Sequence, residues 1–128
     1  MRRLIPAALM AGLLAMPAPA AKSDPDAELA RYLEGRTPGP PVDCISLFPS
    51  NHSTTIGTTI VYEAGGTRYV NRLGGDCTPM RDDTIIITRT PGNRLCRGDI
   101  AQFVTRSPPA IPVGSCSFDS FTPYRKAK

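Results

Sequence analysis

Apolar and polar residues alternate in short runs over residues 42–123, and glycine or proline separates the runs, which is typical of short β-strands. The clearest case surrounds Gly65-Gly66, where the runs 58–64 and 67–73 flank a two-residue turn that requires positive φ angles. The expected hairpin pairs Ala64 with Thr67, Glu63 with Arg68, Tyr62 with Tyr69, Val61 with Val70 and Ile60 with Asn71. This register joins opposite charges, two aromatic rings and two valines. It also places Asn71 on an apolar face, so Asn71 is expected to point inward.

Residues 84–90 form the strongest predicted strand, because three consecutive isoleucines lie between threonines. A continuous apolar run is typical of a strand buried on both faces, so we expect it at the centre of a sheet. Pro91-Gly92 suits a turn, and residues 95–105 and 115–121 are expected as further strands. The predicted fold class is therefore mainly β, as a small antiparallel barrel or rolled sheet of five to six short strands, stapled by disulfides, with one short N-terminal helix.

One helix is predicted, over residues 23–34. Ser23 or Asp24 can cap its N-terminus, Pro25 suits its first turn and Gly35 can end it. Its apolar stripe consists of Leu29, Tyr32 and Leu33. Because so short a helix is marginal alone, the stripe is expected to dock on the β domain.

The first twenty residues match a secretory signal peptide. Arg2 and Arg3 precede the apolar run 4–16, and Ala18-Pro19-Ala20 resembles a cleavage site. The apolar run is shorter than the ~17–25 residues of a membrane-spanning helix. The expected organisation is a signal peptide over 1–20, a helix and Pro/Gly linker over 21–41, a cysteine-stapled β domain over 42–123 and a basic tail over 124–128. It predicts an exported protein, periplasmic or extracellular, that does not span the membrane.

Basic residues exceed acidic ones mainly at the two ends of the chain. The sequence contains 15 Lys and Arg against 11 Asp and Glu. Arg2 and Arg3 belong to the expected signal peptide, and the C-terminal residues 125–128 are basic, whereas acidic and basic residues balance between Asp43 and Asp119. A neutral region offers no broad cationic surface, which argues against nucleic acid as a partner.

The four cysteines of an exported chain predict two disulfides. They are Cys44, Cys77, Cys96 and Cys116. The chain has no C-x-x-C motif and a single histidine, so neither a zinc site nor a dithiol redox site is indicated, and no cofactor is expected. Four cysteines allow three pairings. We favour Cys44–Cys77 with Cys96–Cys116, because this pairing closes the two shortest disjoint loops.

Candidate chemical residues are few. His52 lies among serine and threonine residues and is the candidate general base of a hydrolase, although a polar loop is the simpler explanation and the one we favour. Asp82 and Asp83 are adjacent carboxylates that could contribute to a calcium site, or that could form the turn before a strand. Asp99 is expected to cap backbone donors or to pair with an arginine.

Several segments in this order resemble a family of small exported proteins of Gram-negative bacteria that is classed as a domain of unknown function. The segments are Val42-Asp43-Cys44-Ile45, Thr59-Ile60-Val61-Tyr62, Tyr69-Val70-Asn71-Arg72-Leu73 with Cys77 after it, Leu95-Cys96-Arg97-Gly98-Asp99-Ile100, and Cys116 with Phe121-Thr122-Pro123. The resemblance runs from about residue 36 to 123 and includes all four cysteines. It implies a periplasmic or secreted, cysteine-stapled β domain, and it assigns no catalytic residues.

Three functions remain open at this point. The leading hypothesis is a non-catalytic exported module that binds a protein or cell-envelope partner, with its oligomeric state undetermined. The alternatives are a small envelope hydrolase using His52 and a small-ligand carrier with a barrel interior. A binding module predicts an exposed apolar patch, a hydrolase predicts His52 beside a carboxylate in a cleft, and a carrier predicts a continuous apolar cavity.

Overall fold

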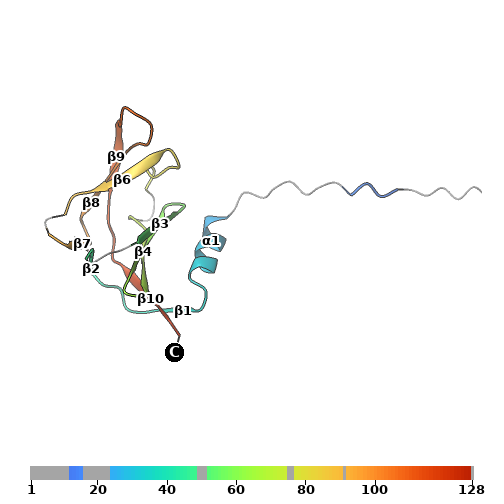
Figure 1. Cartoon of the computed structure of the whole chain (residues 1–128), viewed down its shortest axis with the longest axis horizontal. Helices are drawn as coiled ribbons and strands as arrows, with labels where there is room; N and C mark the ends of the chain where they lie inside the picture. Colours follow the sequence, from blue (N-terminus) through green and yellow to red (C-terminus); the bar gives the residue numbers. More distant parts are fainter. Residues whose placement is uncertain (1–11, 16–23, 49–51, 75–76, 91, 128) are drawn as a thin grey trace, which may run out of the picture.

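A computed structural model describes residues 12–15, 24–48, 52–74, 77–90 and 92–127 (Figure 1). Most of the expected signal peptide lies outside these residues. In chain order the elements are α1 (Pro25–Tyr32), β1 (Arg36–Pro38), β2 (Cys44–Ser46), β3 (His52–Ile56), β4 (Thr59–Ala64), β5 (Thr67–Asn71), β6 (Thr84–Thr88), β7 (Arg94–Cys96), β8 (Ile100–Thr105), β9 (Pro112–Ser117) and β10 (Thr122–Lys126). No helix of the described residues is long and apolar enough to cross a bilayer.

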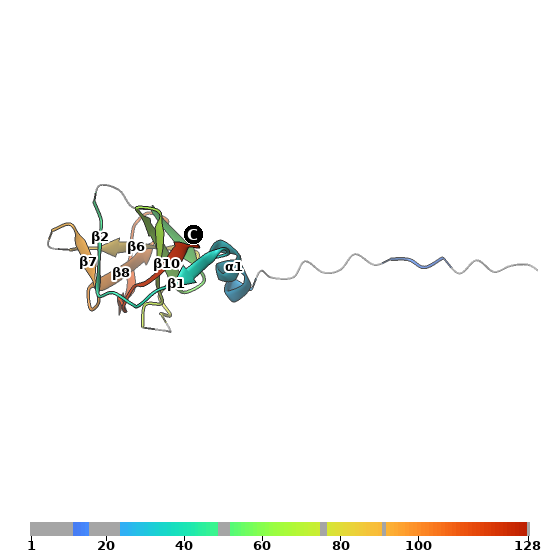
Figure 2. The same cartoon turned by 90° about the horizontal axis from the view of Figure 1, so that it is seen from below.

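The strands form three antiparallel sheets, so the mainly β prediction is confirmed, with more strands than expected. The sheet orders are β1-β10-β5-β4-β3, β2-β7 and β6-β8-β9. None of these sheets closes into a barrel. Figure 2 shows the β2-β7 pair at the end of the molecule opposite to α1.

The predicted hairpin around Gly65-Gly66 is confirmed pair by pair. β4 and β5 pair in the expected register, from Ala64 opposite Thr67 to Ile60 opposite Asn71. Gly65 and Gly66 have φ angles of 60° and 78°, which side-chain-bearing residues rarely adopt. Local turn chemistry and side-chain pairing therefore determine this register.

Helix α1 forms where the sequence predicts it and docks on one face of the five-stranded sheet. The Asp24 side chain caps the helix by accepting a hydrogen bond from the Asp26 N–H at 3.0 Å. Leu29 is buried in a small cluster with three apolar residues of the sheet. These residues are Ile56, Val61 and Val70. At the end of the helix, the Arg68 guanidinium lies 3.9 Å from the centre of the Tyr32 ring.

The segments expected as a linker and a basic tail are partly strands. Arg36–Pro38 forms β1 and pairs with the last residues of β10, so that Thr37 lies opposite Arg125. β1 and the C-terminal strand thereby extend the sheet beside the β4-β5 hairpin.

A second, larger core lies between the three sheets. Its largest fully buried side chains are aromatic: Phe103 from β8, and Phe118 and Phe121 from the segment before β10. The Phe118 and Phe121 rings are stacked with their centres 6.1 Å apart, and Tyr62 meets Phe121 edge-on at the same distance. Side chains therefore fill the interior of the fold.

The favoured disulfide pairing is wrong, because the structure joins Cys44 to Cys96 and Cys77 to Cys116. Cys44 and Cys96 lie directly opposite each other on β2 and β7, with their Cα atoms 4.0 Å apart. The neighbouring pair carries the backbone hydrogen bond, from the Arg97 N–H to the Asp43 carbonyl, so the cysteines occupy the position where side chains approach most closely. Strand pairing therefore decides which cysteines form a disulfide. The lengths of the loops between the cysteines do not indicate this pairing.

The prediction that residues 84–90 form a central strand is also wrong. β6 pairs with β8 and with no other described strand, so it is an edge strand. Ile85 and Ile87 are 41% and 38% exposed, whereas Ile86 between them is half-buried and packs against the core. The isoleucine run is therefore buried on one face only.

Asn71 points inward, as predicted, and its side chain is fully buried. Its amide Nδ2 donates to the Asp119 carbonyl at 2.7 Å. Its Oδ1 accepts from the N–H groups of Leu73 and Asp119, at 3.0 and 3.1 Å. One buried amide thus connects the end of β5 to the segment between β9 and β10.

We expect a peptide map of the oxidised, unreduced protein to link Cys44 to Cys96 and Cys77 to Cys116. Replacing both Cys77 and Cys116 by Ser is expected to lower the free energy of unfolding by about 2–4 kcal/mol, because the unfolded chain loses a crosslink. Urea titration of the variant and the parent measures this loss. A peptide that links Cys44 to Cys77 would contradict the pairing.

The Asn71→Ala substitution is expected to lower the free energy of unfolding by about 2–4 kcal/mol. It leaves one buried carbonyl and two N–H groups without their partner, at about 1–3 kcal/mol for an unsatisfied group. Thermal and urea unfolding report the change. Asn93→Ala, at an exposed loop position, is the control and should change stability by less than ~0.5 kcal/mol. Equal stabilities for the two variants would refute the bridging role of Asn71.

Burial raises the pKa of Tyr62 to about 12. Between pH ~10 and ~12 the unfolded chain releases this proton and the folded chain keeps it, so stability should fall by about 2–3 kcal/mol as pH rises. Urea unfolding at several pH values measures the slope. Tyr62→Phe should remove this contribution and the late absorbance change at 295 nm, whereas Tyr69→Phe should retain both. A late absorbance change that persists in Tyr62→Phe would contradict the assignment.

Candidate interaction surface

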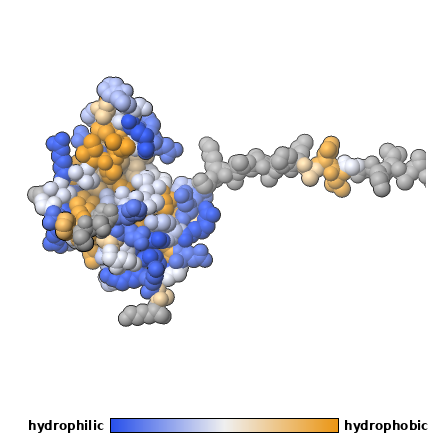
Figure 3. Space-filling view, in the orientation of Figure 1, coloured by the Kyte–Doolittle hydropathy of each residue, from blue (hydrophilic) through white to orange (hydrophobic). Residues whose placement is uncertain are grey.

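The outer face of the β6-β8-β9 sheet carries isoleucines that face solvent. The pairing of β6 with β8 places Ile85 opposite Val104 and Ile87 opposite Gln102, on the face away from Phe103. Ile100, at the start of β8, continues this face and is 54% exposed. We call Ile85, Ile87 and Ile100 the isoleucine face. Figure 3 shows apolar surface gathered over β6.

Exposed β-branched apolar side chains on one sheet face favour contact with another surface. Burial of apolar area contributes about 25 cal/mol per Å² of free energy. Contiguous apolar patches of more than a few hundred Å² on a protein surface often mark interaction sites. The isoleucine face is therefore the strongest candidate interaction surface among the described residues.

The open edge of β6 adds backbone groups to this surface. The Arg106 N–H donates to the Asp83 carbonyl at 2.7 Å, so the backbone groups of Asp83 point toward β8. Backbone direction repeats every second residue along a strand, so Ile85 and Ile87 also direct their N–H and C=O groups toward β8. Ile86 and Thr88 then direct their N–H and C=O groups to the other side, where no described strand pairs with them. Such an edge can accept an additional strand.

A cleft lies beside the same end of β6. Two adjoining cavities of about 580 and 220 Å³ lie between the ends of β3 and β6. They share the lining residues Thr55, Met80, Arg81, Thr84 and Arg106. The gap between the edge strands of two sheets is the point where the sheets fail to close into a barrel.

The structure places His52 at the beginning of β3, exposed to solvent. Its cross-strand neighbour is Glu63, but the Glu63 carboxylate lies 3.5 Å from the Arg68 Nε atom. His52 does not line the cleft. No side-chain hydrogen bond of His52 occurs within the described part of the chain. The geometry gives no carboxylate that would orient His52 as a general base.

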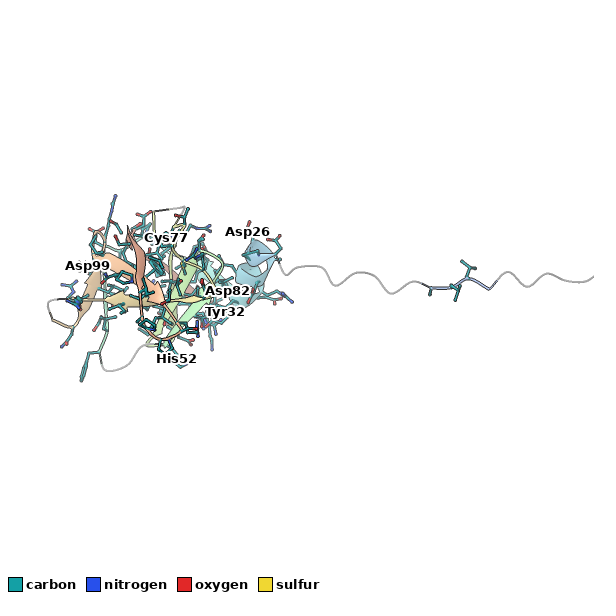
Figure 4. All side chains as sticks on the ribbon, turned by 90° about the horizontal axis from the view of Figure 1, so that it is seen from above. Asp26, Tyr32, His52, Cys77, Asp82 and Asp99 are labelled. Carbon is teal, nitrogen blue, oxygen red and sulfur yellow. A yellow bond between two sulfur atoms is a disulfide. The ribbon has the colours of Figure 1, made fainter. Side chains whose placement is uncertain are left out.

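Asp82 and Asp83 lie in the turn before β6. Asp82 lines the cleft, and the Asp83 carboxylate lies 3.4 Å from the Arg81 Nε atom at the surface. Across residues 24–48, 52–74, 77–90 and 92–127, no three acidic, histidine or cysteine side chains are grouped so that they could hold a metal ion. Asp99 caps a turn as expected, accepting from the Cys96 N–H at 2.8 Å. Figure 4 shows Asp82 and Asp99 far apart.

Sequence reasoning missed the isoleucine face because it took the run 84–90 as buried on both faces. Ile100 offered the missed signal: it shares a face of its strand with polar Gln102, which indicates a face near solvent.

Comparisons with known proteins end without a match: no protein-family model, no curated protein and no solved structure matches this chain.

Proposed function

We propose that this protein is an exported, non-catalytic binding module that contacts a protein or cell-envelope partner through the isoleucine face. The observation that carries this proposal is the exposure of Ile85, Ile87 and Ile100 on one side of a sheet. Burying these side chains against a partner would return the free energy that their exposure costs.

The location of the protein is part of the proposal. Two disulfides are consistent with an oxidising compartment, such as the bacterial periplasm or the exterior of the cell. The family resemblance, from about residue 36 to 123, agrees with the same compartments.

The alternative functions receive less support from the geometry. A carrier with a barrel interior needs a closed barrel, and none of the three sheets closes; the cavities of about 580 and 220 Å³ lie in the cleft between β3 and β6. A hydrolase based on His52 needs an orienting acid, and Glu63 lies within ion-pair distance of Arg68 instead. Of the three hypotheses, only the binding module gives the exposed isoleucines a function.

The double substitution Ile87→Ser and Ile100→Ser is expected to reduce partner capture from a periplasmic extract by at least ~10-fold, because it removes apolar area from the contact. Quantitative mass spectrometry of the crosslinked eluate measures the recovery. Phe48→Ser is the matched control, because Phe48 is 70% exposed and lies on another segment. Equal recovery with the parent and the double variant would refute the proposal.

A further inference from the structure

β6 differs from the other outer strands of the two larger sheets. β1 contains arginine and proline, β3 is polar over four of its five residues, and β9 begins with Pro112 and contains glycine and serines. Charge, proline and irregularity are the usual means by which proteins prevent strands from joining at an edge. β6 has none of these features between Thr84 and Thr88, so its edge is open to a further strand.

The sequence of β6 is also symmetric. Thr84-Ile85-Ile86-Ile87-Thr88 reads identically in both directions. We propose that β6 pairs antiparallel with β6 of a second copy of this chain, about a two-fold axis at Ile86. In this register Ile86 lies opposite Ile86 of the second copy, Ile85 opposite its Ile87, and Thr84 opposite its Thr88. The two-fold symmetry produces the last two pairs twice. Each is a favourable β-branched pair.

The backbone of β6 fits this register. Ile86 and Thr88 turn their N–H and C=O groups to the open edge, as the Arg106–Asp83 hydrogen bond implies. At the two-fold axis, the Ile86 N–H of each copy can donate to the Ile86 carbonyl of the other. The Thr88 N–H can donate to the Thr84 carbonyl. The pairing thus uses groups that β8 leaves free.

The residues that flank β6 supply charge complementarity. The same register places Asp83 opposite Arg89 of the second copy, and the symmetry produces this contact twice. Both residues are exposed and share the outer face with Ile85 and Ile87. The present contact of Asp83 with Arg81 is an exposed ion pair, which contributes little and does not prevent exchange.

The result is one continuous sheet with the order β9-β8-β6-β6-β8-β9. Adjoining strands in this sheet lie about 4.8 Å apart. The two isoleucine faces then form one doubled surface. The inference rests on the proposed function only for this last step, because the pairing itself depends on the edge of β6.

Charge reversal tests the pairing with the full-length oxidised chain. Asp83→Arg and Arg89→Asp each create like-charge contacts at both ends of the paired strands. A one-to-one mixture of these two variants restores opposite charges at both ends, and so does the double variant. Sedimentation equilibrium at low salt, over a concentration series, measures the dimerisation constant of each sample. Because the contact between the copies is confined to one strand pair and its flanking charges, a weak dimer is expected, and the concentration series extends from the micromolar range upward.

We expect the parent to dimerise, each single variant to dimerise at least ~10-fold more weakly, and the mixture and the double variant to regain most of the loss. A parent that remains monomeric up to its solubility limit would overturn the inference. Single variants that dimerise like the parent, or a mixture that stays monomeric, would overturn it equally.

The same variants separate this inference from the proposed function. Asp83→Arg keeps Ile85, Ile87 and Ile100, so partner capture by this variant reports the isoleucine face independently of self-association. Ile100→Ser, outside β6, should weaken partner capture and leave dimerisation unchanged. Capture without dimerisation by the parent would overturn the strand pairing alone, and dimerisation with capture that ignores Ile100 would overturn the proposed function alone.

Discussion

One shared core holds three small sheets in place, and two crossing disulfides constrain it. An isolated pair of short strands is marginal in water, so the β2-β7 pair would not persist alone. Ile45, Leu95, Phe103 and Phe121 bring the three sheets to the same apolar centre. The disulfides join residues separated by 52 and 39 positions in an interleaved order, so each closes a loop that contains a cysteine of the other. This restricts the unfolded chain and favours the compact arrangement.

The same arrangement leaves a gap between β3 and β6. Helix α1 covers one face of the five-stranded sheet through Leu29, and the aromatic core covers the other face. On the outer face of the three-stranded sheet, Val104 is buried, whereas Ile85, Ile87 and Ile100 remain partly exposed. The unpaired edge of β6 arises because the sheets meet without closing into a barrel, and the isoleucines are exposed because they lie on the face of β6 and β8 that points away from the core. We place the interaction surface there because burial and pairing are both incomplete.

The polar groups away from this surface are largely engaged within the fold. Asn71 and Asp99 satisfy backbone groups, and Glu63 lies beside an arginine that also stacks on Tyr32. Groups used in this way stabilise turns and strand ends, and they are not free to act on a substrate. The proposed binding function therefore rests on the partly exposed isoleucines of β6 and β8.

Local physical chemistry determined the features that the sequence predicted correctly. The cap of α1 depends on residues two positions apart, and the β4-β5 register depends on a two-residue turn and the side chains beside it. The inward position of Asn71 follows from that register. Tertiary structure alone decided the disulfide partners and the exposure of Ile85 and Ile87. Cys44 meets Cys96 because two strands distant in sequence pair, and β6 lies at an edge because none of the described strands pairs on its other side. Both outcomes depend on long-range contacts, which composition and periodicity do not encode.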